Sequence, residues 1–362
     1  MLFPYTYVPH SMEKMQEFIE YIFFEVWSKA PEGQPFGFDL FNAKPDLKAV
    51  MEAFYYSDAK GANFFYGHVE RIYLLFAALS PAQINQLQAW FSGNNDIAGL
   101  CQNDPTVAIA RYSDLKTFHP SIAESLTLFY KGLYSKDLLN LAALKSVIGE
   151  MDDHHTKFTE VNKQGKCPFC GINDVKGIYH SKREAYDHYL PKGKYPFNSI
   201  NFNNLAPACH ECNSTYKLSQ DPLYDVKDPL LAHTGGRRKS FYPYQTSPYP
   251  IELNITLNSP DWTNITREDV SLTTGPEELR EEIDTWLDVY GIEERYKAKC
   301  CGENDGKGWI VEILDEWKED GRDPEDYLKT LARHAKKRPY TDDNFLKRPF
   351  LEACRKSGLF ER

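Results

Sequence analysis

Four cysteines in two close pairs carry the clearest chemical signal in this sequence. Cys167 and Cys170 form the first Cys-x-x-Cys pair, and Cys209 and Cys212 form the second. Two thiolates at this spacing can reach one ion from a tight turn, and two such pairs provide the closed tetrahedral site of structural zinc. We therefore predict that these four side chains bind one structural Zn²⁺. A redox-active thiol site is the alternative.

A carboxylate, an imidazole and a carboxamide accompany the cysteine pairs. Asp187 and His188 are adjacent in a short stretch that favours a strand running into the loop at Pro191, and Asn213 directly follows the second pair. Carboxylate and amide oxygens suit Mg²⁺ or Mn²⁺, and a neutral imidazole can deprotonate an attacking water near neutral pH. This chemistry fits hydrolysis of a phosphodiester, with Asp187 and Asn213 on the catalytic cation and His188 as the general base.

The predicted strand and helix must bring these side chains to one place. A helix from about residue 208 to about residue 219 puts Asn213 and Lys217 on one face, because they are four positions apart. The bound zinc would anchor this helix against the strand that carries Asp187. Adjacent residues in a strand point to opposite faces, so a bend or bulge at the end of the strand is needed to bring His188 to the same site.

The order of these residues resembles that of the HNH endonuclease family. The elements that carry the resemblance are Asp-His-Tyr-Leu-Pro at 187–191, Asn-Leu at 204–205, and Cys-His-Glu-Cys-Asn followed by a lysine at 209–217. Members of that family have a ββα-metal fold, and Cys-x-x-Cys zinc pairs accompany it. The match covers residues 167–217 of a chain of 362 residues.

The resemblance implies a DNA endonuclease and a role for each matching residue. His188 would be the general base, and Asp187 and Asn213 would bind the catalytic Mg²⁺ or Mn²⁺. Asn204 would orient the hairpin loop, and Lys217 would lie near a substrate phosphate. A weaker resemblance to HNH effectors of bacterial anti-phage defence systems of the Septu type implies a partner protein such as an ATPase.

The net charge restricts how the chain could bind DNA. Lysine and arginine number 42 against 52 aspartate and glutamate residues, which gives a formal charge of −10. A protein that contacts nucleic acid over its whole surface would be basic. Phosphate contacts are therefore expected from a local patch, a bound cation or a partner. We predict that Lys192 and Lys194, which follow the Asp187-His188 strand, contribute to this patch.

The rest of the sequence supplies the elements around this segment. We expect an α+β fold, in which a mainly helical chain carries the small zinc-stapled ββα-metal module. Residues 1–161 would form a helical domain for scaffolding or docking, 162–222 the nuclease module, and 223–362 a mixed region. Helical periodicity of apolar residues predicts helices over 11–27, 46–56, 63–79, 81–91, 122–134, 136–151, 277–290, 306–317 and 324–335, and alternation predicts a strand over 251–257.

Two other functions remain open from the sequence. A zinc-ribbon module could bind protein or nucleic acid without catalysis, and an RNA-cutting toxin could use the same side chains. No run of about 18 apolar residues suggests a membrane span, and the first residues lack a secretory pattern, so we expect a cytoplasmic protein.

Overall fold

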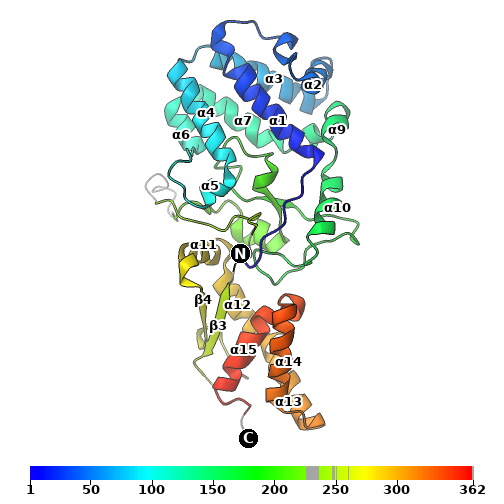
Figure 1. Ribbon diagram of the computed structural model, residues 1–362, viewed down its shortest axis with the longest axis vertical. Coiled ribbons are helices and arrows are strands. Elements are labelled where there is room, and N and C mark those ends of the chain that lie inside the picture. Colours follow the sequence, from blue (N-terminus) through cyan, green and yellow to red (C-terminus); the bar gives the residue numbers. More distant parts are fainter. Residues whose placement is uncertain (226–235, 247–248, 250, 260, 361–362) are drawn as a thin grey trace.

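The computed structural model describes residues 1–225, 236–246, 249, 251–259 and 261–360. It is mainly helical within these ranges and contains two small antiparallel sheets of two strands each. This agrees with the expected α+β class. Two helical regions lie at opposite ends of the molecule, and the segment with the cysteine pairs lies between them (Figure 1). None of the described helices is long and apolar enough to cross a membrane.

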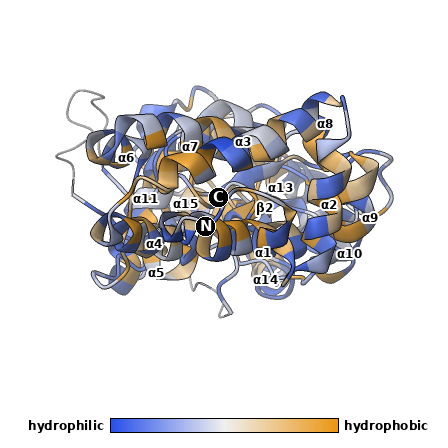
Figure 2. Cartoon of the chain, turned by 90° about the horizontal axis from the view of Figure 1, so that it is seen from above, coloured by the Kyte–Doolittle hydropathy of each residue, from blue (hydrophilic) through white to orange (hydrophobic). Residues whose placement is uncertain are grey.

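The N-terminal region is a bundle of amphipathic helices. The predicted periodicity holds in α1, where Met15, Phe18 and Ile19 are buried. Helix α4 begins at a capping box formed by Ser80 and Gln83. The bounds are α1 Lys14–Tyr21 with its continuation η2 Ile22–Trp27, α2 Pro45–Tyr55, α3 Lys60–Phe76, α4 Pro81–Asn95, α5 Ile97–Cys101, α6 Tyr112–Phe118, α7 Pro120–Leu133, α8 Lys136–Leu139, α9 Ala142–Ile148 and α10 Met151–Val161. Hydrophobic and hydrophilic residues alternate around these helices (Figure 2).

One predicted helix is wrong in its extent. The stretch 136–151 was expected to be continuous, but it forms α8, α9 and the start of α10. The break before α10 lies at Gly149, whose φ of +78° and ψ of −158° are accessible to glycine and end α9. The break matters for the site, because it makes α8, α9 and α10 a bent wall beside the central segment.

The central segment forms a hairpin followed by a short helix. Strand β1 (Tyr186–His188) pairs antiparallel with β2 (Leu205–Pro207), and Asp187 lies opposite Ala206. The helical turn η6 (Glu211–Lys217) follows β2. The order strand, strand, helix is the one that the sequence predicted, and η6 lies inside the expected range of 208–219.

The C-terminal region combines a second hairpin with five helices. Strands β3 (Glu252–Leu257) and β4 (Val270–Gly275) pair antiparallel along their whole length. Helix α15 packs on β3 and α14, and α12 packs on β4. The helices are α11 Arg280–Tyr290, α12 Ile292–Cys300, α13 Gly306–Asp320, α14 Pro324–Lys337 and α15 Asn344–Lys356. The sequence had predicted β3, α11, α13 and α14, and had missed β4, α12 and α15.

The buried hydrophobic residues of the described chain form two cores, and the central segment contributes to both. One core joins the N-terminal helices to Tyr186, Phe202 and Leu205 of the central hairpin. The other joins the C-terminal helices to the four cysteines and to Met1–Tyr5. The central segment therefore has no separate core, because its buried residues are divided between two larger ones.

Candidate metal centre and active site

The four predicted zinc ligands meet at one buried point. The sulfur atoms of Cys167, Cys170, Cys209 and Cys212 all lie within 4.8 Å of one another. The first pair sits in a turn closed by the Gly171 amide, which donates to the Cys167 carbonyl at 2.7 Å. Gly171 has a φ of +70°. The structure thus confirms that these cysteines form a cluster that could hold a metal ion such as zinc.

Backbone amides and a buried cation donate hydrogen bonds to the sulfur atoms of this cluster. The backbone amide of Cys209 donates to Cys167 Sγ at 3.5 Å, and that of Cys212 donates to Cys209 Sγ at 3.4 Å. The Arg295 guanidinium donates to Cys212 Sγ at 3.3 Å. Hydrogen bonds from the neighbouring thiols hold the pKa of Cys170 well below its usual value, whereas burial raises the pKa of Cys167 and that of Cys212 well above theirs. Arg295 thus offsets part of the negative charge that four thiolates would bring to a buried place.

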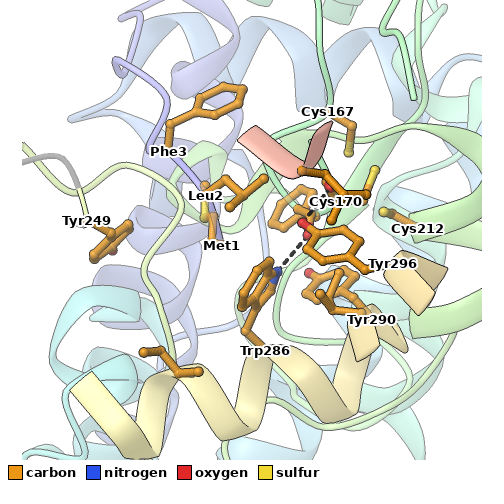
Figure 3. Packing of buried hydrophobic residues seen from close by; sticks show 14 of the residues in the cluster. Met1, Leu2, Phe3, Cys167, Cys170, Cys212, Tyr249, Trp286, Tyr290 and Tyr296 are labelled. Atoms are coloured by element: carbon orange, nitrogen blue, oxygen red, sulfur yellow. Dashed lines mark hydrogen bonds between the residues drawn. The ribbon is translucent and has the colours of Figure 1, made fainter. Parts of the chain in front are cut away.

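The N-terminal segment and the helices α11 and α12 hold the first cysteine turn (Figure 3). Leu2 donates its amide to the Pro168 carbonyl at 2.9 Å. From the other side, Trp286 Nε1 donates to the Phe169 carbonyl at 2.6 Å, and the Tyr296 hydroxyl donates to the Cys170 carbonyl at 2.8 Å. The turn therefore has packing and hydrogen-bond support besides any metal, which the sequence did not indicate.

Asn204 fixes the loop that leaves β1. Its side chain is fully buried. The Leu190 amide donates to Asn204 Oδ1 at 2.7 Å, and Asn204 Nδ2 donates back to the Leu190 carbonyl at 3.0 Å. A second bond from Nδ2 reaches the Asn198 carbonyl at 3.3 Å. These hydrogen bonds join the two sides of the hairpin loop. The role that the resemblance implies for Asn204 stays a prediction.

His188 is a neutral imidazole with one nitrogen committed to the backbone. Its Nε2 lies 2.8 Å from the Ser199 carbonyl, which can only accept, so Nε2 carries the proton and Nδ1 keeps its lone pair. The ring packs edge-on against Tyr134 at 4.8 Å. Burial lowers the pKa of His188 to about 3, and the positive charge of Lys192 adds to this effect. The imidazole is thus uncharged at neutral pH.

Asp187 forms a buried ion pair on the other side of β1. Its Oδ1 accepts from Lys217 Nζ at 2.9 Å, and the exposed fractions of the two side chains are 3% and 0%. Its Oδ2 is buried and has no hydrogen-bond partner among the described residues. Burial raises the pKa of Asp187, although the Lys217 charge opposes the shift. One oxygen of this carboxylate is therefore available for a further positive group.

The position of Lys217 differs from the expectation that it would lie near a substrate phosphate. Its ammonium is enclosed, and its second hydrogen bond runs to the His188 carbonyl at 2.8 Å. The physical reason is the neighbouring carboxylate, because a lysine can be buried when an opposite charge accompanies it. In this structure Lys217 joins η6 to β1.

The structure does not bring all the predicted side chains into contact. β1 pairs regularly with β2 through His188, without the bend that was expected to turn Asp187 and His188 to one face. Asp187 meets Lys217, whereas His188 meets Tyr134 and the Ser199 carbonyl. Asn213 is half-buried on η6, and its backbone N–H donates to the Cys209 carbonyl at 3.0 Å.

The two lysines that follow β1 lie in different surroundings. Lys192 Nζ lies 5.5 Å from the centre of the Tyr134 ring, which itself contacts His188. Burial lowers the pKa of Lys192. Lys194 is half-exposed, and its carbonyl accepts from the Tyr112 amide at 3.0 Å. Lys192 thus places a positive charge next to the imidazole, while the backbone of Lys194 is tied to α6.

The buried pair predicts a large loss of stability when one partner is removed. Lys217→Ala should lower the free energy of unfolding by about 3–5 kcal/mol, because it leaves the Asp187 carboxylate buried and unpaired. Lys318→Ala, an exposed lysine on α13, is the matched control and should change it by less than about 0.5 kcal/mol. Urea denaturation measures both values. Equal losses in the two variants would mean that Lys217 is solvated in solution.

Comparison with known proteins gives one partial similarity. The chain is 35% identical to protein ea31 of Escherichia phage lambda over 75 residues, which are 20% of this chain and 23% of that protein. The similarity thus spans less than a quarter of either protein. No protein-family model matches the sequence, and no solved structure matches it.

Proposed function

We propose that this protein is a metal-dependent endonuclease of the HNH type that hydrolyses phosphodiester bonds in DNA. One observation carries the proposal. On a single strand–strand–helix unit beside the cysteine cluster, a neutral imidazole keeps a free nitrogen and a buried carboxylate keeps a free oxygen. A base and an oxygen ligand are the two groups that hydrolysis of a phosphodiester by an activated water requires.

His188 supplies the base. Nδ1 has the lone pair that takes the proton from the attacking water, because the Ser199 carbonyl holds the proton on Nε2. The same hydrogen bond fixes the plane of the ring, and Tyr134 packs against it. The oxygen of the water then attacks phosphorus, and the bond from phosphorus to the 3′ oxygen breaks. The products are a 5′ phosphate and a 3′ hydroxyl.

The donor set of Asp187 and Asn213 fits Mg²⁺ or Mn²⁺. The unpartnered Asp187 Oδ2 is the kind of buried atom that a cation would satisfy, and the Asn213 amide oxygen is the same hard type of donor. Such a cation, when bound, stabilises negative charge on the phosphate and on the leaving oxygen. Lys217 holds Asp187 Oδ1 and so keeps the carboxylate in one orientation.

The cysteine cluster supports this unit rather than the reaction. Four thiolates fill a tetrahedral zinc site and leave no position for water or substrate. Cys209 and Cys212 lie at the start of η6, the helix that carries Asn213 and Lys217. A bound zinc would therefore fix η6 relative to β1. We also propose a role in anti-phage defence with a partner ATPase. The sequence resemblance alone supports this role.

Cleavage of plasmid DNA tests the proposal directly. The purified full-length protein, incubated with supercoiled plasmid and Mn²⁺, should produce nicked and linear DNA, and omission of the divalent cation should stop the reaction. Retained zinc, measured in the same samples, shows that the cysteine site is intact. Cleavage of RNA but not DNA would favour the RNA-cutting toxin. DNA binding without any cleavage would favour the zinc-ribbon module.

A further inference from the structure

A groove of about 820 Å³ is lined in part by Tyr134, and the proposed function does not assign it. Its walls are α8, the bend between α9 and α10, α10 itself and the loop 177–185 that precedes β1. Tyr134 lines the groove, and its ring also packs against the His188 imidazole at 4.8 Å. The Tyr134 ring therefore separates the groove from the candidate base.

The charges of the groove favour a polyanion. Its three carboxylates are each paired with a cation, in the ion pairs Lys145–Glu150 at 2.6 Å, Arg183–Asp152 at 2.7 Å and Lys176–Glu184 at 3.1 Å. Lys136 and Lys182 also line the groove, and neither forms an ion pair with a described residue. The acidic side chains are thus neutralised while two lysines remain available. This is a local exception in a chain with a net charge of −10.

An exposed aromatic ring stands on the rim of the same groove. Tyr179 is 94% exposed, and its neighbours Ile178 and His180 both line the groove. The base of this loop is fixed, because the backbone amide and the ammonium of Lys176 both donate to Glu184 Oε1 at 3.1 Å. A solvent-exposed tyrosine ring on a loop with a fixed base offers a flat face on which a nucleobase can stack.

We propose that this groove binds single-stranded DNA, with Tyr179 stacked on an unpaired base and with Lys136 and Lys182 against phosphates. The inference rests on the proposed function and names the form of DNA that the site takes. Stacking on Tyr179 distinguishes single-stranded DNA from duplex DNA, because bases inside a duplex already stack on each other and have no free face. A strand bound in this groove would contact Tyr134, the ring that packs against His188.

Fluorescence anisotropy with labelled oligothymidylate tests the inference on the full-length protein, with no divalent cation added. Tyr179→Ala should weaken binding about 5- to 150-fold, since stacking contributes about 1–3 kcal/mol per base. Tyr179→Phe should retain the parent affinity, because it keeps the ring. Tyr56→Ala is the matched control: Tyr56 is 81% exposed, does not line the groove, and should have no effect.

Salt dependence and a duplex probe complete the test. Lys182→Ala should reduce the slope of log affinity against log salt by about 0.7, the value for one phosphate contact on a single strand. A hairpin duplex of the same label should bind Tyr179→Ala as well as it binds the parent. The inference is overturned if Tyr179→Ala binds oligothymidylate as tightly as Tyr179→Phe does, or if duplex binding falls equally.

The two proposals can fail separately. If the protein cleaves plasmid DNA but Tyr179→Ala binds oligothymidylate as tightly as the parent does, the nuclease proposal stands and the groove proposal is wrong. If the protein cleaves no nucleic acid but its binding of oligothymidylate depends on the Tyr179 ring, the groove proposal stands and the nuclease proposal is wrong.

Discussion

Replacing His188 with alanine should lower the rate of DNA cleavage by about 10²–10⁴-fold, because the general base is lost. Fold and zinc content should not change, since the hydrogen bond and the ring contact of this side chain are to the Ser199 carbonyl and the Tyr134 ring rather than to the cysteine cluster. Single-turnover cleavage of a labelled DNA measures the rate, and circular dichroism with metal analysis measures the rest. Cleavage at the parent rate would exclude His188 as the base.

The cation ligands should respond differently from the base. Asp187→Ala and Asn213→Ala should also slow cleavage, but raised Mg²⁺ or Mn²⁺ should partly restore it, because these variants weaken binding of the ion rather than proton transfer. Rescue of His188→Ala by added metal, with none for Asp187→Ala, would reverse the two roles. Because Asp187 also pairs with Lys217, its free energy of unfolding must be measured alongside.

Loss of one cysteine ligand should have the largest effect on stability. Cys170→Ser or Cys212→Ser should reduce bound zinc from about one ion per chain to almost none, and binding of structural zinc contributes on the order of 10 kcal/mol to folding. The cysteines belong to the same core as α11 and α12, so this core should loosen with them. Metal analysis and thermal unfolding provide the two measurements.

A cysteine outside the cluster and an intrinsic fluorophore sharpen this experiment. Cys301→Ser is the control, because Cys301 lies on the edge of the core and is not a member of the cluster. Trp286 is one of six tryptophans, and its Nε1 donates to the Phe169 carbonyl between the first two cysteines. The summed tryptophan emission should shift to longer wavelength in Cys170→Ser and not in Cys301→Ser, and this difference should be smaller when Trp286 is replaced by Phe in both variants. A stable, zinc-free parent protein would contradict the metal site itself.

Local features of this chain were predictable from the sequence. The paired cysteines, the strand through Asp187 and the helix after Cys209 follow from spacing and periodicity alone, which act within a few residues. Helix starts with strong caps, such as Ser80, were also found at the correct place. Short elements without a strong pattern, including β4 and α12, were missed because tertiary packing rather than local preference stabilises them.

The surroundings of the site were not predictable, for three physical reasons. Lys217 is buried by an ion pair with a residue 30 positions away, whereas a lysine is exposed by default. Ser199 holds His188 through its backbone carbonyl, and a carbonyl has no sequence signal. Arg295 donates to Cys212 Sγ although the two residues are 83 positions apart, and the sequence around Arg295 has no motif that predicts this contact.

The central hairpin contributes to both hydrophobic cores, and this predicts how fragments of the protein should behave. Leu205 faces the N-terminal helices while its neighbour Ala206 faces the C-terminal ones, as successive residues of a strand must. A fragment of residues 162–222 would expose both apolar faces at once, so it should aggregate when produced alone. The candidate site lies on the hairpin that connects the N-terminal and C-terminal cores. Neither half could be exchanged for that of another protein without rebuilding one side of the hairpin.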